Sequence, residues 1–180
     1  TIAWDDPDDL WRVTPLTVRA YPNGPADVNH FHAAGGIGFV LRELIDAGLV
    51  HADIPCVSGG DLRQQAMGPW LDGTALRWRE PPEATLDAGV VGPAAAPFDV
   101  GGGLRRVQGT LGRGIVKISA VAPEFRRIEA PARVFESQDD LLAAFKDGTL
   151  TGDLVAVIRG QGPRANGMPE LHKLTPTLAA

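Results

Sequence analysis

The chain has 180 residues, 22 of them glycine and 15 proline, with a formal net charge of -5. So many helix breakers exclude a plain helical bundle, the acidic balance excludes the broad basic surface of a nucleic-acid binder, and no run of about 18 apolar residues provides a membrane span. We therefore expect a soluble, loop-rich globular protein with neither nucleic acid nor membrane as a partner.

Cysteine usage and the two ends narrow the class further. Cys56 is the single cysteine, which excludes an intrachain disulfide and any cluster of several thiolates built from this chain alone. The acidic start at residues 1–9 lacks the basic region of a secretory signal. The first residue is not Met, and residues 175–180 carry no obvious end signal. We expect a cytoplasmic location and a piece of a longer protein.

The first half of the chain reads as helical, with tight turns between helices. Residues 8–13 are expected to form a short helical turn that Asp8 caps. Residues 37–47 place apolar side chains at helical spacing, and Gly48 is a suitable left-handed cap. A second short helix is expected at 61–67, stopped by Gly68 and Pro69. All four tryptophans (4, 11, 70 and 78) lie in this half, and we interpret them as packing anchors.

A glycine- and proline-rich connector at 89–103 separates this half from a region of strand signals. Branched residues predict strands at 114–121 and 132–136, and the continuously apolar run 154–159 predicts a buried strand. Ser137 is the expected cap of a helix at 138–146, which Gly148 closes. The chain is therefore expected to be mixed α/β.

The densest group of chemically useful side chains follows the last predicted strand. The glycine-rich loop 160–174 carries an amide, a carboxylate and cations, which suit a metal, a sugar acid or a phosphate. The spacing alone favours a solvated surface loop, and the loop matches neither the phosphate-binding nor the dinucleotide-binding glycine motif. Its side chains of interest are Arg164, Asn166, Glu170, His172 and Lys173.

Three other features have structural interpretations beside functional ones. His30 and His32 would face the same way on a strand but diverge on a helix, and a structural role in which one of them caps a helix end is favoured over a metal pair. The nearby Gly35-Gly36 pair allows close backbone approach. Gly101-Gly-Gly is interpreted as a hinge, because no helix follows it to hold an anion. Cys56 is expected to be inert, because no base is placed beside it in sequence.

Four strings of the sequence carry a family resemblance that covers nearly the whole chain. They are residues 21–36 (Tyr21-Pro-Asn-Gly through Asn29-His-Phe-His to Gly36), 116–121 (Val-Lys-Ile-Ser-Ala-Val), 128–135 and 159–176. The chain resembles the dihydroxy-acid dehydratase family. Its Asn-Gly-Met-Pro-Glu-Leu-His-Lys string, residues 166–173, is closer to the branch that acts on phosphogluconate than to the dihydroxy-acid branch.

The resemblance implies a longer enzyme of two domains. Residues 1–95 would be the C-terminal end of an N-terminal α/β domain, and residues 96–180 the first part of a swivelling, β-barrel-like C-terminal domain. The implied reaction is loss of water from 6-phospho-D-gluconate in the Entner–Doudoroff pathway. The implied cofactor is a 4Fe-4S cluster whose ligands lie outside this chain, and the implied full-length assembly is a homodimer.

The resemblance also suggests roles within the loop. A glutamate of the family's Gly-Met-x-Glu motif ligates magnesium in related enzymes, and it maps onto Glu170. Asn166 and Lys173 are the expected substrate-binding residues. The family's catalytic serine segment has no match here, so the catalytic base is unknown. One departure is Thr110, where the family has Asn in a Gly-Asn-Leu turn, and we interpret it as a turn variation.

Two other functions remain open from the sequence. The chain could belong to a dehydratase of the same family that acts on another sugar acid or a dihydroxy acid, or it could be a binding module that reuses the swivelling domain without catalysis. In either enzyme reading we expect the 180 residues alone to be inactive.

Overall fold

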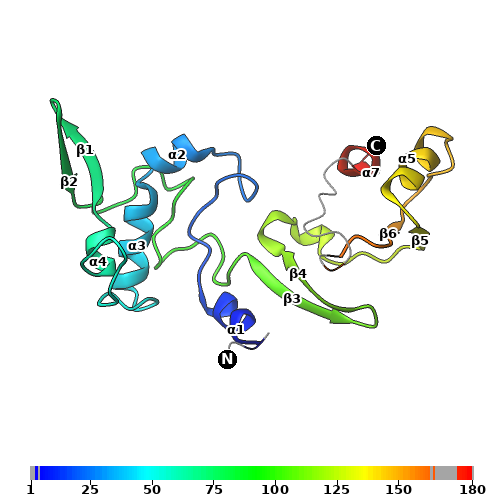
Figure 1. The fold of residues 1–180 in the computed structure, drawn as a ribbon, viewed down its shortest axis with the longest axis horizontal. Coiled ribbons are helices and arrows are strands. Elements are labelled where there is room, and N and C mark those ends of the chain that lie inside the picture. The colour runs from blue at the N-terminus through cyan, green and yellow to red at the C-terminus, as the bar shows by residue number, and fades with distance from the viewer. Residues whose placement is uncertain (1–2, 4, 163, 165–173, 180) are drawn as a thin grey trace. The chain divides into compact units, whose positions relative to one another are not determined.

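The computed structural model describes every residue except 1–2, 4, 163, 165–173 and 180 (Figure 1). The chain packs as two compact units, Thr1–Arg126 and Arg127–Ala180. Helices and short strands occur in both units, so the fold is mixed α/β as the sequence indicates. The strands of the described residues pair as two-stranded sheets and close no barrel. No helix in this described part is long and apolar enough to cross a membrane.

The described residues of the first unit form the α-helices α1 (Asp5–Val13), α2 (Val28–Ala33), α3 (Gly36–Asp46) and α4 (Leu62–Gln65). The two helices predicted at 37–47 and 61–67 are confirmed as α3 and α4. Gly48 follows α3 with φ of 70°, a left-handed conformation that glycine adopts without steric cost. Asp61 caps α4 by accepting a hydrogen bond from the Gln64 amide at 2.9 Å.

The core of this unit lies where α2 and α3 meet two extended segments. Phe39 and Val91 are 1% and 0% exposed. Val18 forms an isolated antiparallel β-bridge with Val91. Gly35, at φ 131°, lies directly over this core: a Cβ there would stand 2.8 Å from the Phe39 Cβ. The expected close approach at the glycine pair is confirmed, and it lets the turn between α2 and α3 close over Phe39.

The polar face of α3 is not free in solvent. Arg42 donates to the backbone carbonyl oxygens of Pro81, Pro82 and Glu83, and Glu43 Oε2 accepts from the Ala94 amide at 2.9 Å. The side chains of Arg42 and Glu43 are 17% and 19% exposed. The helix therefore uses charged residues to hold the returning segment 81–94 against the core.

The strand predicted at 114–121 is shorter than expected. It is β4 (Gly112–Lys117), paired antiparallel with β3 (Leu104–Gly109), and it gives way to a 3-10 turn, η1 (Ile118–Ala120). The prediction is wrong at its end because the Ser119 amide turns back to the Gly103 carbonyl at 3.2 Å. A further 3-10 turn, η2 (Pro123–Phe125), follows.

A second hairpin, β1 (Gly68–Asp72) and β2 (Ala75–Arg79), was not expected from the sequence. It extends away from α3 and α4 in Figure 1. Trp70 and Trp78 lie on it and are 39% and 60% exposed, so their interpretation as packing anchors is wrong within these described residues. Trp4 lies outside the described residues.

The expected cap role of Asp8 is also wrong. Asp8 lies inside α1 and is 5% exposed. Its Oδ1 accepts from the Arg106 amide of β3 at 2.9 Å, and its Oδ2 accepts from Arg12 Nε at 3.0 Å. The carboxylate therefore accepts a hydrogen bond from a backbone amide of β3 and not from the amides at the start of its own helix.

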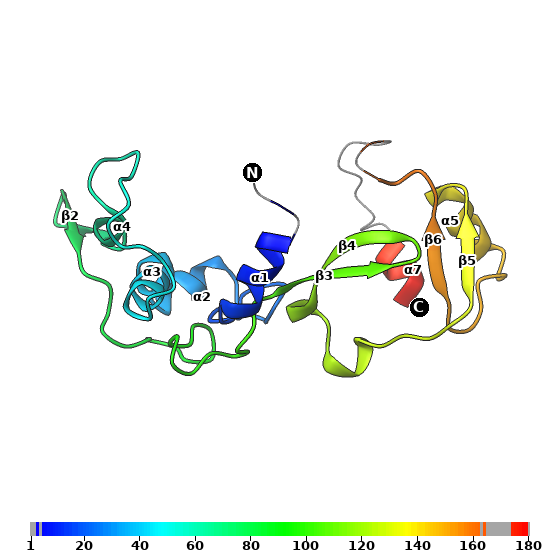
Figure 2. The ribbon, with the colours of Figure 1, turned by 90° about the horizontal axis from the view of Figure 1, so that it is seen from below.

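The second unit is a parallel β–α–β arrangement. Strand β5 (Ala132–Phe135) pairs parallel with β6 (Val155–Ile158), and α5 (Gln138–Lys146) connects them and packs beside the pair (Figure 2). Ser137 caps α5 through the Asp140 amide at 3.1 Å, and Gly148 closes it at φ 67°. These predictions are confirmed.

The core of the second unit is small. Phe135, Leu141 and Leu174 form it, with Leu174 standing just before α7 (Thr175–Ala179). The expectation that the last strand is buried is wrong: Val155 is 41% exposed, and the other three residues of β6 are only partly buried. In the described residues, the two-stranded sheet is covered by α5 on one face, and a parallel sheet ordinarily has both faces covered.

Candidate functional site

The three residues predicted to bind metal or substrate, Glu170, Asn166 and Lys173, lie outside the described residues, as does His172. The structure does describe the strands and turns from which their loop departs. Gly160 begins that loop directly after β6, with φ of 66°. The candidate site is therefore built from the carboxyl ends of β5 and β6.

Polar side chains from both strand ends meet at this edge. Arg159 Nη1 lies 2.6 Å from Glu136 Oε1, and Gln138 Nε2 donates to Gln161 Oε1 at 2.9 Å. Ligands of open parallel sheets bind at the carboxyl ends of the strands, where the loops after neighbouring strands converge. This is also the edge where the sequence predicts the functional loop.

Gln138 and Gln161 were missed by the sequence reasoning. Gln161 Nε2 donates to the Arg159 carbonyl at 3.4 Å, which orients its Oε1 toward Gln138. Gln138 then presents its Nε2 to that oxygen, and its own Oε1 is buried with no hydrogen-bond partner among the residues that the structure describes. The pair fixes the first residues of the loop to the start of α5. A glutamine directly after an N-cap serine is a weak sequence signal, because glutamine is common in first helical turns.

Of the two histidines that were expected to be structural, His30 is confirmed in that role. Both lie on α2, so their side chains diverge. The His30 amide donates to Asp27 Oδ1 at 2.9 Å and the Asp27 amide donates to His30 Nδ1 at 3.5 Å, and these two contacts form a capping box. The His30 backbone N–H lowers the pKa of the Asp27 carboxyl below its ordinary value.

No group of three or more His, Cys, Asp or Glu side chains that could hold a metal ion occurs among the residues that the structure describes. Cys56 Sγ lies 3.7 Å from the Ile54 carbonyl oxygen, and its amide donates to the Gly60 carbonyl at 3.0 Å. The cysteine is part of a tight turn. One thiol cannot supply the ligands of a cluster, so an iron–sulfur group does not fit the residues of this chain.

A polar junction joins distant segments of the first unit. Ser119 Oγ donates to Asn23 Oδ1 at 2.8 Å, and a Cβ on Gly103 would stand 2.7 Å from the same Ser119 Oγ. At Gly102, a Cβ would stand 2.4 Å from the Trp11 carbonyl oxygen. The triple glycine is therefore packed closely against Trp11 and Ser119. Its interpretation as a flexible hinge is wrong.

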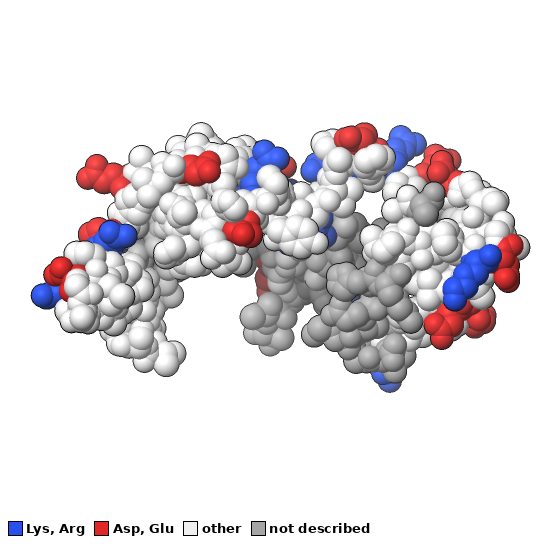
Figure 3. Space-filling view, turned by 90° about the horizontal axis from the view of Figure 1, so that it is seen from above, with Lys and Arg blue, Asp and Glu red and all other residues white. Residues whose placement is uncertain are grey.

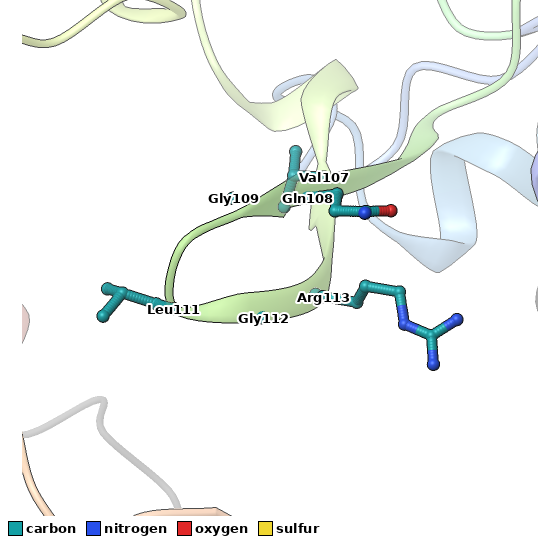
Figure 4. A pocket seen from close by; sticks show the side chains of 7 residues that line it. Val107, Gln108, Gly109, Leu111, Gly112 and Arg113 are labelled. Atoms are coloured by element: carbon teal, nitrogen blue, oxygen red, sulfur yellow. The ribbon is translucent and has the colours of Figure 1, made fainter.

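A hollow lies at the outer end of β3 and β4 (Figure 4). Residues 107–109 and 111–114 line it. Leu111 and Arg113 point outward from the strands in Figure 4, and Leu111 is 94% exposed. Thr110 lies in the turn at this tip, as expected for a turn variation. The hollow lacks a set of convergent titratable groups.

Charged side chains of both signs are scattered over the described residues in Figure 3. The same mixing appears in the ion pairs, such as Arg63 with Asp46 at 3.2 Å and Arg106 with Asp5 at 2.9 Å.

Sequence comparison defines the class. Residues 1–65 match the family profile described as Dihydroxy-acid/6-phosphogluconate dehydratase N-terminal, and residues 89–180 match its C-terminal counterpart. The chain belongs to the dihydroxy-acid/6-phosphogluconate dehydratase family, a family of hydro-lyases.

Comparison with individual members of the family distinguishes its two branches. The chain is 54% identical over 177 residues to the phosphogluconate dehydratase of Pseudomonas aeruginosa and 52% identical to that of Escherichia coli K12, in each case over 98% of this chain. It is 37% identical over 96% of its length to a dihydroxy-acid dehydratase of Nitratidesulfovibrio vulgaris. The chain spans 29% of the length of each of these relatives.

Proposed function

We propose that this chain is part of a phosphogluconate dehydratase, which removes water from 6-phospho-D-gluconate to give 2-dehydro-3-deoxy-6-phosphogluconate. The observation that carries the proposal is the difference in identity: 54% to a phosphogluconate dehydratase against 37% to a dihydroxy-acid dehydratase, over nearly the same residues. The reaction is a step of the Entner–Doudoroff pathway, and a cytoplasmic homodimer is the expected form of the complete enzyme.

Within that enzyme, residues 1–95 would end the N-terminal domain and residues 96–180 would begin a swivelling, β-barrel-like domain. The change of composition at 89–103 supports this boundary. The 4Fe-4S cluster of the family would be held by cysteines of other segments, because Cys56 stands alone in this chain. Held there, such a cluster would supply a Lewis acid for the leaving hydroxyl.

The loop after β6 would bring this chain's own residues to the reaction. Glu170 offers the carboxylate that a divalent cation such as magnesium prefers. Lys173 offers a cation, and Asn166 an amide, for the acid and hydroxyl groups of the substrate. The contacts of Gln138 and Gln161 would hold the start of this loop at the strand ends.

A chimaeric enzyme tests the proposal. This chain replaces the matching segment of the Pseudomonas aeruginosa enzyme, and turnover is measured with 6-phospho-D-gluconate and with a dihydroxy acid. We expect turnover of the phosphorylated sugar acid, and none from the 180 residues alone. A folded, cluster-loaded chimaera that acts on the dihydroxy acid instead would contradict the proposal. Activity of the 180 residues alone would contradict the idea that the reactive centre needs other segments.

The role of Glu170 has its own test in the same chimaera. Glu170→Gln keeps the size of the side chain but removes its charge, and we expect turnover to fall by about two orders of magnitude or more. The matched control is Glu129→Gln, because the Glu129 side chain is 91% exposed and lies outside the proposed site. Equal magnesium dependence in both variants would exclude Glu170 as a ligand.

A further inference from the structure

The register of the hairpin β1–β2 gives it one wholly apolar face. Pro69 pairs with Trp78 and Leu71 pairs with Leu76. Since cross-strand partners share a face and successive residues alternate between faces, these four side chains lie together. We call them the apolar hairpin face.

The opposite face is polar and has its own contacts. Arg79 lies over the Trp70 ring, 5.8 Å from its centroid, and Arg77 Nε lies 3.7 Å from Asp72 Oδ2. A guanidinium over an indole and an ion pair between neighbouring strands are both suited to a surface in water. The hairpin therefore has a face adapted to solvent and a face that is not.

The apolar hairpin face is nonetheless exposed in this chain. Leu71, Leu76 and Trp78 are 68%, 61% and 60% exposed. An isolated two-stranded hairpin is marginally stable in water unless a hydrophobic face is packed against something. A contiguous apolar patch of this kind marks a contact surface.

The size of the face indicates what kind of contact it makes. One Trp, two Leu and one Pro side chain bury on the order of 400 Å² when covered, whereas a stable complex between two proteins buries roughly 800 Å² per partner. A face this small is too weak to hold a second copy alone. It suffices within one polypeptide, because an intramolecular contact does not pay for bringing two molecules together.

The comparisons indicate where such a segment exists. The relatives are more than three times as long as the part that this chain spans, 29% of their length. The hairpin follows directly after residues 1–65, which match the N-terminal profile, and lies before residues 89–180, which match the C-terminal one. The nearest family domain in sequence is therefore the N-terminal one.

We propose that the apolar hairpin face packs against the part of the N-terminal dehydratase domain that the relatives have and this chain does not span, with Trp78 as its central side chain and Arg77 and Arg79 directed to solvent. The inference rests on the proposed function, because it requires the chain to be part of a longer dehydratase.

Hydroxyl-radical footprinting read by mass spectrometry tests the contact without any substitution in the hairpin. The 180-residue chain is compared with the chimaeric enzyme. Covering a side chain that is 60% exposed down to about a tenth exposed lowers its oxidation rate about sixfold. We expect this for Trp78 in the chimaera, with Leu71 and Leu76 protected as well, and an unchanged rate for Trp70 as the internal control.

Each outcome decides the inference. Equal oxidation of Trp78 in the two proteins overturns it, and so does protection of Trp70 in place of Trp78. Protection that appears in the 180-residue chain as its concentration rises would assign the face to a second copy instead. A folded chimaera without dehydratase activity but with a protected Trp78 would contradict the proposed function and leave the contact standing.

Discussion

The first unit contains two antiparallel hairpins that differ in how they are anchored. The hairpin β3–β4 is fixed at its base by Asp8, by the Ser119–Asn23 contact and by the packed glycines. In the hairpin β1–β2, the ion pair and the cation–π contact that the structure describes join one strand to the other. A two-stranded sheet needs an external contact to be stable. The first hairpin finds it in residues nearly a hundred positions away, and the second shows an uncovered apolar face.

The largest expected effect breaks the anchor of β3–β4 at Gly102. A Cβ there would stand 2.4 Å from the Trp11 carbonyl oxygen, so one of two backbone segments must move. We expect Gly102→Ala to lower the free energy of unfolding by about 3 kcal/mol, measured by urea denaturation. The matched control is Gly109→Ala at the tip of the same hairpin, where a Cβ meets nothing within 4 Å. Equal effects of the two variants would refute the close packing at Gly102.

The second prediction concerns acid sensitivity at Asp8. The Arg106 backbone N–H, followed by the Arg12 side chain, lowers the pKa of Asp8 below its ordinary value of 3.8. The stabilisation is therefore complete above that value and is lost as the pH falls through the lower pKa of the folded state. Asp8→Asn should remove this part of the pH dependence and lower the hydrogen-exchange protection of the β3 amides at neutral pH.

The contrast between the hairpins provides the control for that experiment. The amides of β1–β2 should exchange at the same rates in Asp8→Asn and in the unsubstituted chain, because Asp8 contacts α1 and β3. Loss of protection in both hairpins together would show that they unfold as one unit and would remove the distinction between them.

A smaller effect is expected at Ser119. Its Oγ donates to Asn23 Oδ1 at 2.8 Å, and both residues are partly buried. We expect Ser119→Ala to cost about 1 kcal/mol, the usual value for one such hydrogen bond. Ser58→Ala is a suitable comparison, because Ser58 makes a 2.8 Å hydrogen bond with Gln65 on the exposed surface and should cost less than half as much. If Ser58→Ala lowers the free energy of unfolding as much as Ser119→Ala does, the Ser119–Asn23 contact stabilises the fold no more than an exposed hydrogen bond.

The elements predicted from the sequence are those determined by local signals. The helix at α5 follows from its Ser137 cap and Gly148 stop, and α3 follows from its apolar spacing and Gly48. The role of Asp8 could not be predicted in the same way, because its partner Arg106 lies far along the chain. In a helix cap and at a strand edge alike, the carboxylate accepts a hydrogen bond from a backbone amide. The residue type alone therefore does not tell which of the two roles an aspartate has.

The missed hairpin is a different kind of failure, because its signal is local. The two-residue loop Gly73-Thr74, with Gly73 at φ 63°, lies between an apolar run and the alternating residues 75–79, a pattern typical of a tight hairpin. The interpretation of Gly68 and Pro69 as the end of a helix concealed this hairpin signal. At the candidate site, the sequence predicts a functional role for the loop after β6, which stays a prediction, and it gives no sign of Gln138 and Gln161, because their contact depends on two strand ends meeting in space.

The smallest expected effect lies on the apolar hairpin face within this chain. Leu76 is 61% exposed, so Leu76→Ser should change the free energy of unfolding of the 180 residues by less than about 0.5 kcal/mol. In the chimaeric enzyme the same substitution should cost about 2 kcal/mol, because there it removes a covered leucine. Arg77→Ser, one residue along and on the opposite face, should have little effect in either protein. If Leu76→Ser is as mild in the chimaera as in the 180 residues, then β1–β2 keeps its apolar face in water even in the complete enzyme. Only β3–β4 would then be anchored by residues from outside the hairpin.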